Sequence, residues 1–387
     1  MNAATLPNAL AMMQRLIAFD TESSKTNLPL IDFIENYLRG LGVASLRVPN
    51  AAGDKSALFA TIGPLADGGV VLSGHTDVVP VAGQPWTSDP FTLRRAGDRF
   101  FGRGSCDMKG FAALALAMVP EFQAARLRHP VHILLSYDEE TTCLGPVDAI
   151  ARFGQSLPRP RAAIVGEPTM MQVADSHKSI ATYMTNVHGH EAHSAKPALG
   201  ANAIEFACEL VGELYRLHAE LGEIGDALGR FDPPQSTLHV GTIAGGTARN
   251  ILARQCAFHW EFRGLPGVAQ DWAVTRFQDY CDRVVMPRLT RYAPDAYIDT
   301  LTEIEIPGLA PEPGSYAETL AFKLSRTNRA IAVPFATEAG RFQAGGIATV
   351  VCGPGSIDQA HQPDEYVDLA QLEAGLEFMR RLAVELA

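Results

Sequence analysis

Side chains that can bind a divalent metal ion follow four separate apolar segments of this chain. They are His75, the pair Glu139 and Glu140, Glu167, and His361. With the glutamate pair counted as one candidate, Asp107 is the fifth, and it precedes a predicted helix. Imidazole nitrogens and carboxylate oxygens are good ligands for zinc and related ions. Two such ions about 3.5–4 Å apart can share a water molecule, lower its pKa and polarise a carbonyl group. The set predicts a two-metal hydrolytic site in which one carboxylate bridges the ions.

Each of these signals has an ordinary alternative when it is taken alone. His75 and Asp77 have the His-x-Asp spacing in which a carboxylate orients a ligand imidazole, but this short pattern is common without a metal. Asp107 lies in a glycine-rich segment, where aspartate also favours a helix cap or a tight turn. Neighbouring carboxylates such as Glu139 and Glu140 usually lie in solvated loops, because burying them together is costly without a cation. Only the combination favours the metal site.

The motifs of several other enzyme classes are absent from this sequence. There is no GxSxG nucleophile elbow and no HExxH zinc helix. The GxxxxGK[ST] spacing of a phosphate loop is absent, and Gly102-x-Gly104 lacks the third glycine of a dinucleotide fingerprint.

The segments that must position the five candidates have the pattern of an α/β domain. Short apolar runs without polar alternation are typical of strands buried on both faces of a largely parallel sheet. The predicted strands are 57–62, 70–72, 131–137, 162–165 and 349–352. The predicted helices are 5–20, 28–41, 110–123, 316–325 and a closing helix from Leu369. Ligands of such sheets bind beyond the carboxyl ends of the strands, where these side chains lie.

A second pattern lies between the two parts of this α/β domain. Strands are predicted at 180–187, 237–243, 251–262 and 296–306, with helices at 201–217 and 272–285. This β-α-β-β-α-β order is ferredoxin-like. We therefore expect a catalytic domain of residues 1–177 and 308–387, with helices on both faces of its sheet. Residues 178–307 are expected to form an inserted domain.

Composition limits the partners and the compartment. The chain has 387 residues, 47% of them hydrophobic and 19% charged, with a net charge of −11. Such acidity disfavours nucleic acid and anionic membranes as partners. No apolar run reaches the ~18–20 residues of a membrane span, and residues 1–20 lack the pattern of a signal peptide. The six cysteines are scattered without a CxxC pair, which is typical of a reduced cytoplasm.

The combination of motifs resembles the co-catalytic zinc aminoacylase and carboxypeptidase family. The matching stretches are Ser73–Asp77, Gly104–Gly110, Asp138–Glu140, Gly166–Pro168 and the late His361. The resemblance covers essentially the whole chain, including the inserted domain. It implies amide hydrolysis by a catalytic domain that binds two metal ions, with residues 178–307 as an inserted lid and dimerisation domain.

The resemblance also implies how the metal ligands divide. His75 and Glu167 would hold one Zn²⁺, and Glu140 and His361 would hold the other. Asp107 would bridge the two ions. Co²⁺ is an expected substitute, because it accepts the same nitrogen and oxygen ligands.

Two further roles in the catalytic domain follow from the resemblance. Asp77 would orient the His75 ring, and Glu139 would be the general base, because a carboxylate bound to zinc is a poor base. Which of the two glutamates is free follows from the family and not from the residues alone. The family also holds the peptide bond between Asp107 and Met108 in the cis form.

Three residues of the inserted domain match substrate-binding positions of the family. His193 matches a histidine that reaches the substrate, often from a partner subunit, whereas His188 and His190 of the same loop have no such match. Arg263 matches a position that binds the substrate α-carboxylate, although a strand-end arginine in a surface ion pair is the alternative. Asn250 is a weaker substrate contact.

The expected substrate is a small N-acyl amino acid. Within the family, stretches such as Ile164–Thr169, Thr337–Gly340 and Val351–Glu365 resemble members that convert N2-acetyl-L-ornithine to ornithine and acetate in arginine biosynthesis. Glu338 would face a cationic amine of that substrate or lie in a solvated loop. The alternatives are acetylcitrulline, succinyl-diaminopimelate or a dipeptide as substrate, and a catalytically silent binding protein. A cytoplasmic homodimer is expected.

Overall fold

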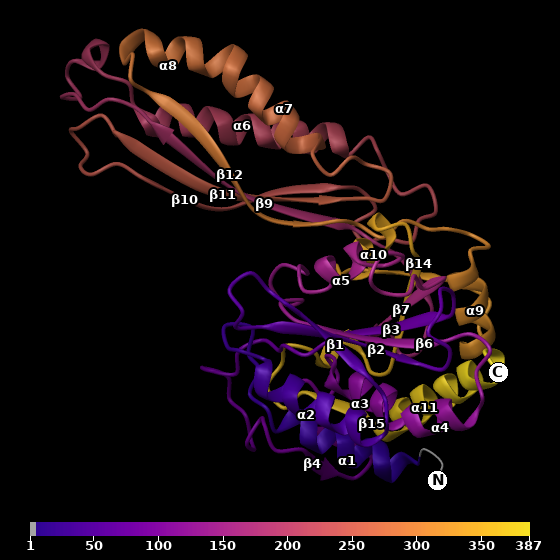
Figure 1. Ribbon diagram of the computed structural model, residues 1–387. Coiled ribbons are helices and arrows are strands. Elements are labelled where there is room, and N and C mark those ends of the chain that lie inside the picture. The colour runs from indigo at the N-terminus through magenta and orange to yellow at the C-terminus, as the bar shows by residue number, and fades with distance from the viewer. Residues whose placement is uncertain (1–4) are drawn as a thin grey trace. The chain divides into compact units, whose positions relative to one another are not determined.

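The computed structural model describes residues 5–387, which form two compact units (Figure 1). The first unit contains the residues up to Ser176, Leu309–Val333 and Thr337–Ala387. The second contains His177–Gly308 and Pro334–Ala336. Among the described residues, no helix is both long and apolar enough to cross a membrane.

The first unit is built on an eight-stranded sheet in the order β1-β2-β6-β3-β7-β14-β8-β13. These strands are β1 (Ser45–Pro49), β2 (Ser56–Ile62), β3 (Val70–His75), β6 (Val131–Ser136), β7 (Ala162–Pro168), β8 (Ala174–His177), β13 (Ile331–Val333) and β14 (Ala348–Gly353). The neighbours β6, β3, β7 and β14 run parallel, whereas β1, β2 and β8 pair antiparallel. The largely parallel sheet is confirmed.

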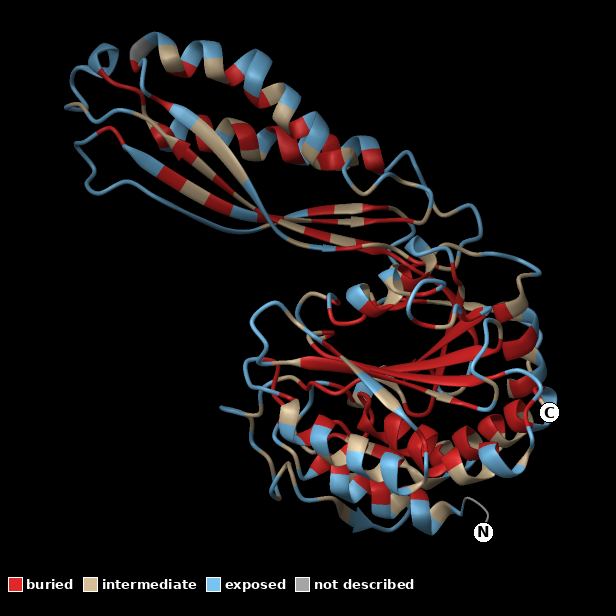
Figure 2. Ribbon diagram, in the orientation of Figure 1, coloured by how far each residue is buried: buried red, intermediate tan, exposed pale blue. Residues whose placement is uncertain are grey.

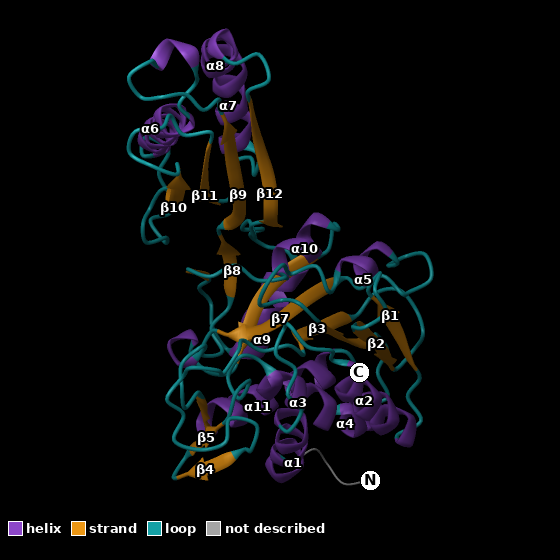
Figure 3. Ribbon diagram, turned by 90° about the vertical axis from the view of Figure 1, so that its left-hand side faces the viewer, coloured by secondary structure: helices purple, strands orange, loops and turns teal. Residues whose placement is uncertain are grey.

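Helices cover both faces of this sheet, as expected. The helices of the first unit are α1 (Leu6–Ile17), α2 (Leu28–Gly40), α3 (Lys109–Ala117), α4 (Val119–Ala124), α5 (Val147–Ala151), α9 (Tyr316–Ser325), α10 (Ala339–Ala344) and α11 (Leu369–Glu385). All but α5 and α10 contribute buried side chains to one core, or pack against it, on the same face of the sheet. Figure 3 shows α5 and α10 on the other side. A separate three-stranded sheet contains β15 (Tyr366–Asp368), β5 (Arg99–Phe101) and β4 (Arg94–Ala96), in that order.

The central strands have the continuous burial that their apolar sequences predict. Every residue of β3, β6 and β7 is buried, which Figure 2 shows as an unbroken red layer. One expected helix differs: residues 110–123 are divided between α3 and α4 at Met118. Pro120 lies in the first turn of α4, and proline cannot continue the hydrogen bonds of a preceding helix.

The second unit has the ferredoxin-like order that the sequence predicts. It contains β9 (Ser179–His188), α6 (Ala203–Leu221), β10 (Thr237–Gly245), β11 (Gln255–Gly264), α7 (Trp272–Tyr280), α8 (Met286–Tyr292) and β12 (Tyr297–Ile306). The antiparallel sheet has the order β10-β11-β9-β12. Residues alternate between buried and less buried along β9, because α6 and α7 cover only one face.

Two boundaries of the second unit differ from the prediction. The strand expected from residue 251 begins at Gln255, and the four residues before it belong to a loop. The helix expected to end at Val285 continues through a π-helical segment, Cys281–Val285, into α8. An apolar pattern locates an element more securely than its ends, which depend on hydrogen bonds that the pattern does not specify.

Candidate metal centre

The five predicted ligands all lie in the first unit, at one edge of its sheet. His75 is the last residue of β3, Glu139 and Glu140 follow β6, and Glu167 lies near the end of β7. These three strands are parallel neighbours, so their carboxyl ends meet at the same edge. His361 comes from the loop after β14, beyond the short 3₁₀ helix Ile357–Gln359, and Asp107 lies two residues before α3.

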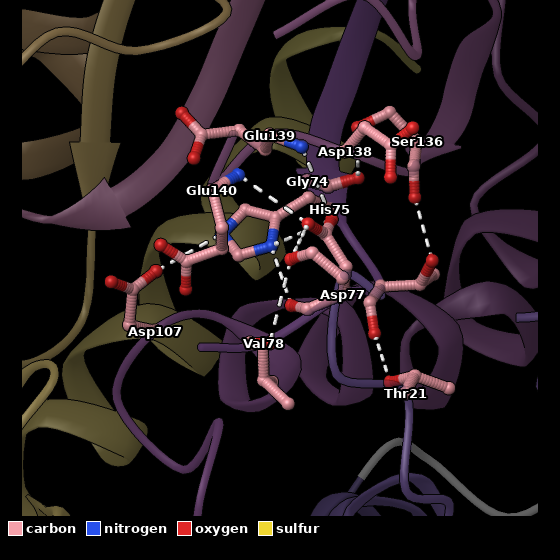
Figure 4. Close-up of polar contacts among 12 residues, drawn as sticks. Thr21, Gly74, His75, Asp77, Val78, Asp107, Ser136, Asp138, Glu139 and Glu140 are labelled. Atoms are coloured by element: carbon pink, nitrogen blue, oxygen red, sulfur yellow. Dashed lines mark hydrogen bonds and ion pairs between the residues drawn. The ribbon is translucent and has the colours of Figure 1, made fainter. Parts of the chain in front are cut away.

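Asp107 lies between the two histidines. His75 Nε2 is 3.0 Å from Asp107 Oδ1 and 3.6 Å from Glu167 Oε1. On the other side, His361 Nε2 is 3.4 Å from Asp107 Oδ2 and 2.8 Å from Glu140 Oε2. Each carboxylate oxygen of Asp107 therefore faces one pair, His75 with Glu167 or His361 with Glu140. Figure 4 shows the side chains of Asp107 and Glu140 close to the His75 ring.

Distance alone does not separate the roles of Glu139 and Glu140. Ligand atoms of His75, Glu139 and Glu167 lie within 4.8 Å of one another, and so do those of His75, Asp107 and Glu140. Both glutamates are thus within reach of a metal ion bound near His75.

Asp77 connects His75 with the two glutamates. Its backbone carbonyl is 2.8 Å from His75 Nδ1, and its carboxylate Oδ1 is 3.5 Å from the same nitrogen. The carboxylate also accepts hydrogen bonds from the backbone N–H groups of Glu139, at 3.2 Å, and Glu140, at 3.3 Å (Figure 4). A third donor is the hydroxyl of Ser23, at 2.7 Å. The sequence suggested the contact with His75 but not the contacts with the glutamate backbone or Ser23.

A buried ion pair holds the loop that carries Asp107. Arg103 and Glu365 have side chains no more than 1% exposed, and Arg103 Nη1 donates to Glu365 Oε2 at 2.7 Å. Glu365 also accepts hydrogen bonds from the backbone N–H groups of Gly104, Cys106 and Asp107, at 2.8–3.1 Å. The peptide bond between Asp107 and Met108 is cis, as the resemblance implies. No local sequence pattern indicated the role of Glu365.

Glu338 does not lie in a solvated loop, which was one of its two sequence-based expectations. It is fully buried before α10, where its carboxylate accepts hydrogen bonds from the hydroxyls of Ser73 and Ser136, both at 2.6 Å. Ser73 lies on β3 two residues before His75, and Ser136 ends β6. Glu338 thus links the two strands that deliver His75 and the glutamate pair.

Four buried carboxyl groups determine the pKa values of the cluster. Burial raises the pKa of Glu139 and of Glu167 well above the usual range, and the negative charges nearby add to this effect. Burial and the charge of Asp107 raise the pKa of Glu140 to about 7. Hydrogen bonds to Asp107 and Glu140 raise the pKa of His361 to about 10. These pKa shifts reflect an excess of negative charge in the cluster.

A divalent cation would neutralise this negative charge. Glu140 Oε1 and Glu167 Oε1 are buried and, among the described residues, have no hydrogen-bond partner. A buried carboxylate oxygen without a partner is costly unless it binds a cation. The donor set of imidazole nitrogens and carboxylate oxygens matches zinc and other first-row ions. The residues therefore fit a metal centre.

The three substrate candidates lie in the second unit and are not buried. His193 is exposed in the loop after β9, where its Nδ1 accepts from the backbone N–H of Ala195 at 3.1 Å. Asn250 is exposed in the loop before β11, and its backbone carbonyl accepts a hydrogen bond from the backbone N–H of Ser194 at 3.0 Å. These two loops are thus paired through their backbones.

Arg263 forms the surface ion pair that the sequence left as an alternative. Its Nε is 3.1 Å from Glu261 Oε1 on the same strand, β11, and its side chain is 38% exposed. This contact engages the guanidinium, but the exposure keeps it accessible to a ligand.

Comparison with known proteins places these observations in one family. Residues 71–385 match the model of the peptidase family M20/M25/M40. The acetylornithine deacetylase of Proteus mirabilis (strain HI4320) is 34% identical over 388 aligned positions, which cover 97% of this chain and 96% of that protein.

Solved structures share the fold of the chain. The aminopeptidase PepT of Bacillus cereus superposes with a TM-score of 0.77 at 17% sequence identity, over 99% of each chain. The YXEP protein of Bacillus subtilis, described as a dinuclear metal binding peptidase, superposes with a TM-score of 0.66 at 17% identity, over 98% of this chain and 99% of that one.

Proposed function

The chain belongs to the peptidase family M20/M25/M40, and we propose that it removes the acetyl group from N2-acetyl-L-ornithine to give L-ornithine and acetate. The observation that carries the proposal is that a relative named acetylornithine deacetylase aligns over nearly the whole chain. In support, all five predicted ligands lie together in one cluster, in which His75 and the three carboxylates are buried. The reaction would serve arginine biosynthesis.

Two Zn²⁺ ions are the proposed cofactor. His75 and Glu167 would hold one ion, His361 and Glu140 the other, and Asp107 would bridge them. The division between the two histidines is supported by the geometry, in which Asp107 Oδ1 faces His75 and Asp107 Oδ2 faces His361. When bound, the ions polarise the acetyl carbonyl group and lower the pKa of the attacking water. Co²⁺ accepts the same ligands.

Glu139 is proposed as the general base. It accepts a proton from the attacking water while the water oxygen forms its bond to the acetyl carbon. When the carbon–nitrogen bond breaks, Glu139 returns the proton to the α-amine that leaves. Asp77 keeps Glu139 in place by accepting its backbone N–H, and it orients His75 at the same time. General acid–base catalysis of this kind contributes about 10²–10⁴-fold to a rate.

Residues of the second unit are proposed to recognise the substrate. His193 donates a hydrogen bond to the oxygen of the tetrahedral intermediate, in its own subunit or in that of a partner. Arg263 binds the α-carboxylate with its planar guanidinium, for which it exchanges its ion pair with Glu261. Asn250 adds a further polar contact. The second unit would also provide the contact of a cytoplasmic homodimer.

The test is release of free α-amine from acetylornithine, acetylcitrulline, succinyl-diaminopimelate and a dipeptide. Each substrate is measured with added zinc or cobalt and again after chelation. We expect metal-dependent turnover with acetylornithine hydrolysed fastest. If another substrate is hydrolysed fastest, the proposed metal centre stands and the proposed specificity is wrong. Absence of turnover with metal bound would overturn the enzyme and favour a binding protein.

A further inference from the structure

We propose that Cys143 is a positioning residue that holds the Glu139 carboxylate through its thiol, an inference that rests on the proposed role of Glu139. The Cys143 sulfur lies 3.4 Å from Glu139 Oε1 and 3.3 Å from the Glu139 carbonyl oxygen. Both oxygens are within reach of the one S–H proton, which they share. The contact fixes Oε1, so that Oε2 is the oxygen that receives the proton of the attacking water.

The surroundings of the sulfur keep it a donor. Cys143 is only 1% exposed. Burial raises the pKa of its thiol well above the ordinary value, and the charge of Glu139 acts in the same direction. The sulfur therefore retains its proton beside the carboxylate. It also lies away from solvent, so water does not compete for Oε1 from that side.

The backbone at this position makes a cysteine unexpected. Cys143 has φ +51°, in the left-handed region that favours glycine. Asp138, which begins the same turn, has φ +56°, and its carbonyl accepts hydrogen bonds from the backbone N–H groups of Thr142 and Cys143 at 2.9 and 2.8 Å. The backbone alone would be served better by glycine at 143. A side chain kept there against that preference is consistent with a use for the thiol.

Both ends of the contact are held from outside the turn. Arg341 of α10 donates from Nε to the carbonyl of Cys143 at 3.2 Å and from Nη2 to that of Thr142 at 3.1 Å. Asp77 accepts the backbone N–H of Glu139 at 3.2 Å. The free torsions that remain are those of the Glu139 side chain, and the thiol restricts them.

Four variants separate this role from packing. Cys143→Ala and Cys143→Gly remove the donor, Cys143→Ser keeps a hydroxyl donor, and Cys281→Ala empties a matched buried position in the second unit. We expect the alanine and glycine variants to lower kcat about three- to tenfold, the range of a typical net hydrogen bond, with KM and metal content unchanged. The serine variant should recover part of this loss, and Cys281→Ala should keep the wild-type kcat.

The glycine variant is the sharpest of these. It relieves the left-handed backbone, so its melting temperature should be no lower than that of Cys143→Ala, although its kcat falls equally. The proposal is overturned if Cys143→Ala keeps the wild-type kcat, or if serine and alanine lose the same amount. Ratios are taken on whichever amide the wild type hydrolyses fastest, so a wrong substrate assignment leaves them valid.

An infrared measurement tests the contact without turnover. The S–H stretch of Cys143 is isolated as the difference between the spectra of the wild type and Cys143→Ala. We expect this band to shift in Glu139→Gln, because a carboxylate is a stronger acceptor than an amide oxygen. An unchanged band would overturn the inference even if the enzyme is active. A shifted band without amide hydrolysis would leave the contact in place and overturn the proposed function alone.

Discussion

The two units present their candidate residues in opposite ways. In the first unit the histidine and carboxylate groups lie at the ends of buried parallel strands, and side chains such as Asp77, Glu338 and Glu365 hold them or the loops that carry them. In the second unit His193 and Asn250 lie on exposed loops that are joined mainly through their backbones.

This difference indicates a division of labour. A metal site must be formed before the substrate arrives, because its charged ligands have to be held close together against their repulsion. Residues that only recognise a substrate can remain solvated until it binds, as loops commonly do. Substitutions of the metal ligands in the first unit should therefore change metal binding and turnover together, and those of the substrate candidates in the second unit should change turnover or KM alone.

The largest expected effect comes from Asp107, which faces both histidines. Asp107→Ala should lose at least one bound ion and reduce turnover by about 10³-fold or more, since bound ions contribute several kcal/mol of transition-state stabilisation. Metal content by mass spectrometry and kcat are measured on the same sample. A variant that retains two ions and most of its activity would contradict the proposed difference between the two units.

The next effect is a loss of stability at acid pH. Each of two buried histidines should lower the free energy of unfolding by about 3 kcal/mol once the pH has fallen to 4 or below. Burial lowers the pKa of His132 in the first unit and of His177 in the second to about 4. Because the unfolded chain binds more protons between pH 4 and about 6.5, each histidine favours unfolding as the pH falls through that window and has no effect above it. Denaturant unfolding of His132→Gln should show a smaller loss between pH 6.5 and 4 than the wild type does. An unchanged slope would contradict a neutral, buried His132.

His193 should have an effect of about 10²-fold on kcat, or about 2.7 kcal/mol, if it stabilises the oxygen of the intermediate. His193→Ala should keep its metal content, which separates it from Asp107→Ala. The matched control is His190→Ala in the same loop, which should keep the wild-type kcat. Equal losses in both variants would show that the loop and not the His193 imidazole matters.

The smallest expected effect is that of Arg263. Arg263→Lys keeps the charge but loses the planar pair of donors, so KM should rise about tenfold while kcat changes little. Steady-state kinetics with acetylornithine measure both constants. A wild-type KM would favour the surface ion pair with Glu261 as the whole role of this residue.

The sequence predicted those parts of the molecule that depend on local pattern. Apolar runs located β3, β6 and β7, and the side chains at their ends, such as His75 and Glu167, come together because parallel strands share an edge. The division of residues 110–123 at Met118 was missed, although Pro120 carries the signal for it.

Such local patterns could not predict contacts between residues that are far apart in the sequence. Glu338 binds Ser73 across 265 positions of the chain, and Glu365 binds the backbone of Cys106 across 259. A buried carboxylate and a solvated one have the same letter in a sequence, and only the fold determines which hydroxyl or amide group comes within hydrogen-bonding distance. The contact of Cys143 with Glu139 spans only four positions, but the sequence did not indicate it, because the left-handed position of its turn is a cysteine and not a glycine.

The most direct test of the account is the metal content and turnover of Glu139→Gln. The structure brings both Glu139 and Glu140 within ligand distance of His75, so the division between base and ligand is the central claim. We expect the variant to bind two ions per chain, as the wild type should, while turnover falls by about 10²–10⁴-fold. Loss of an ion together with turnover would make Glu139 a metal ligand and contradict its role as the base.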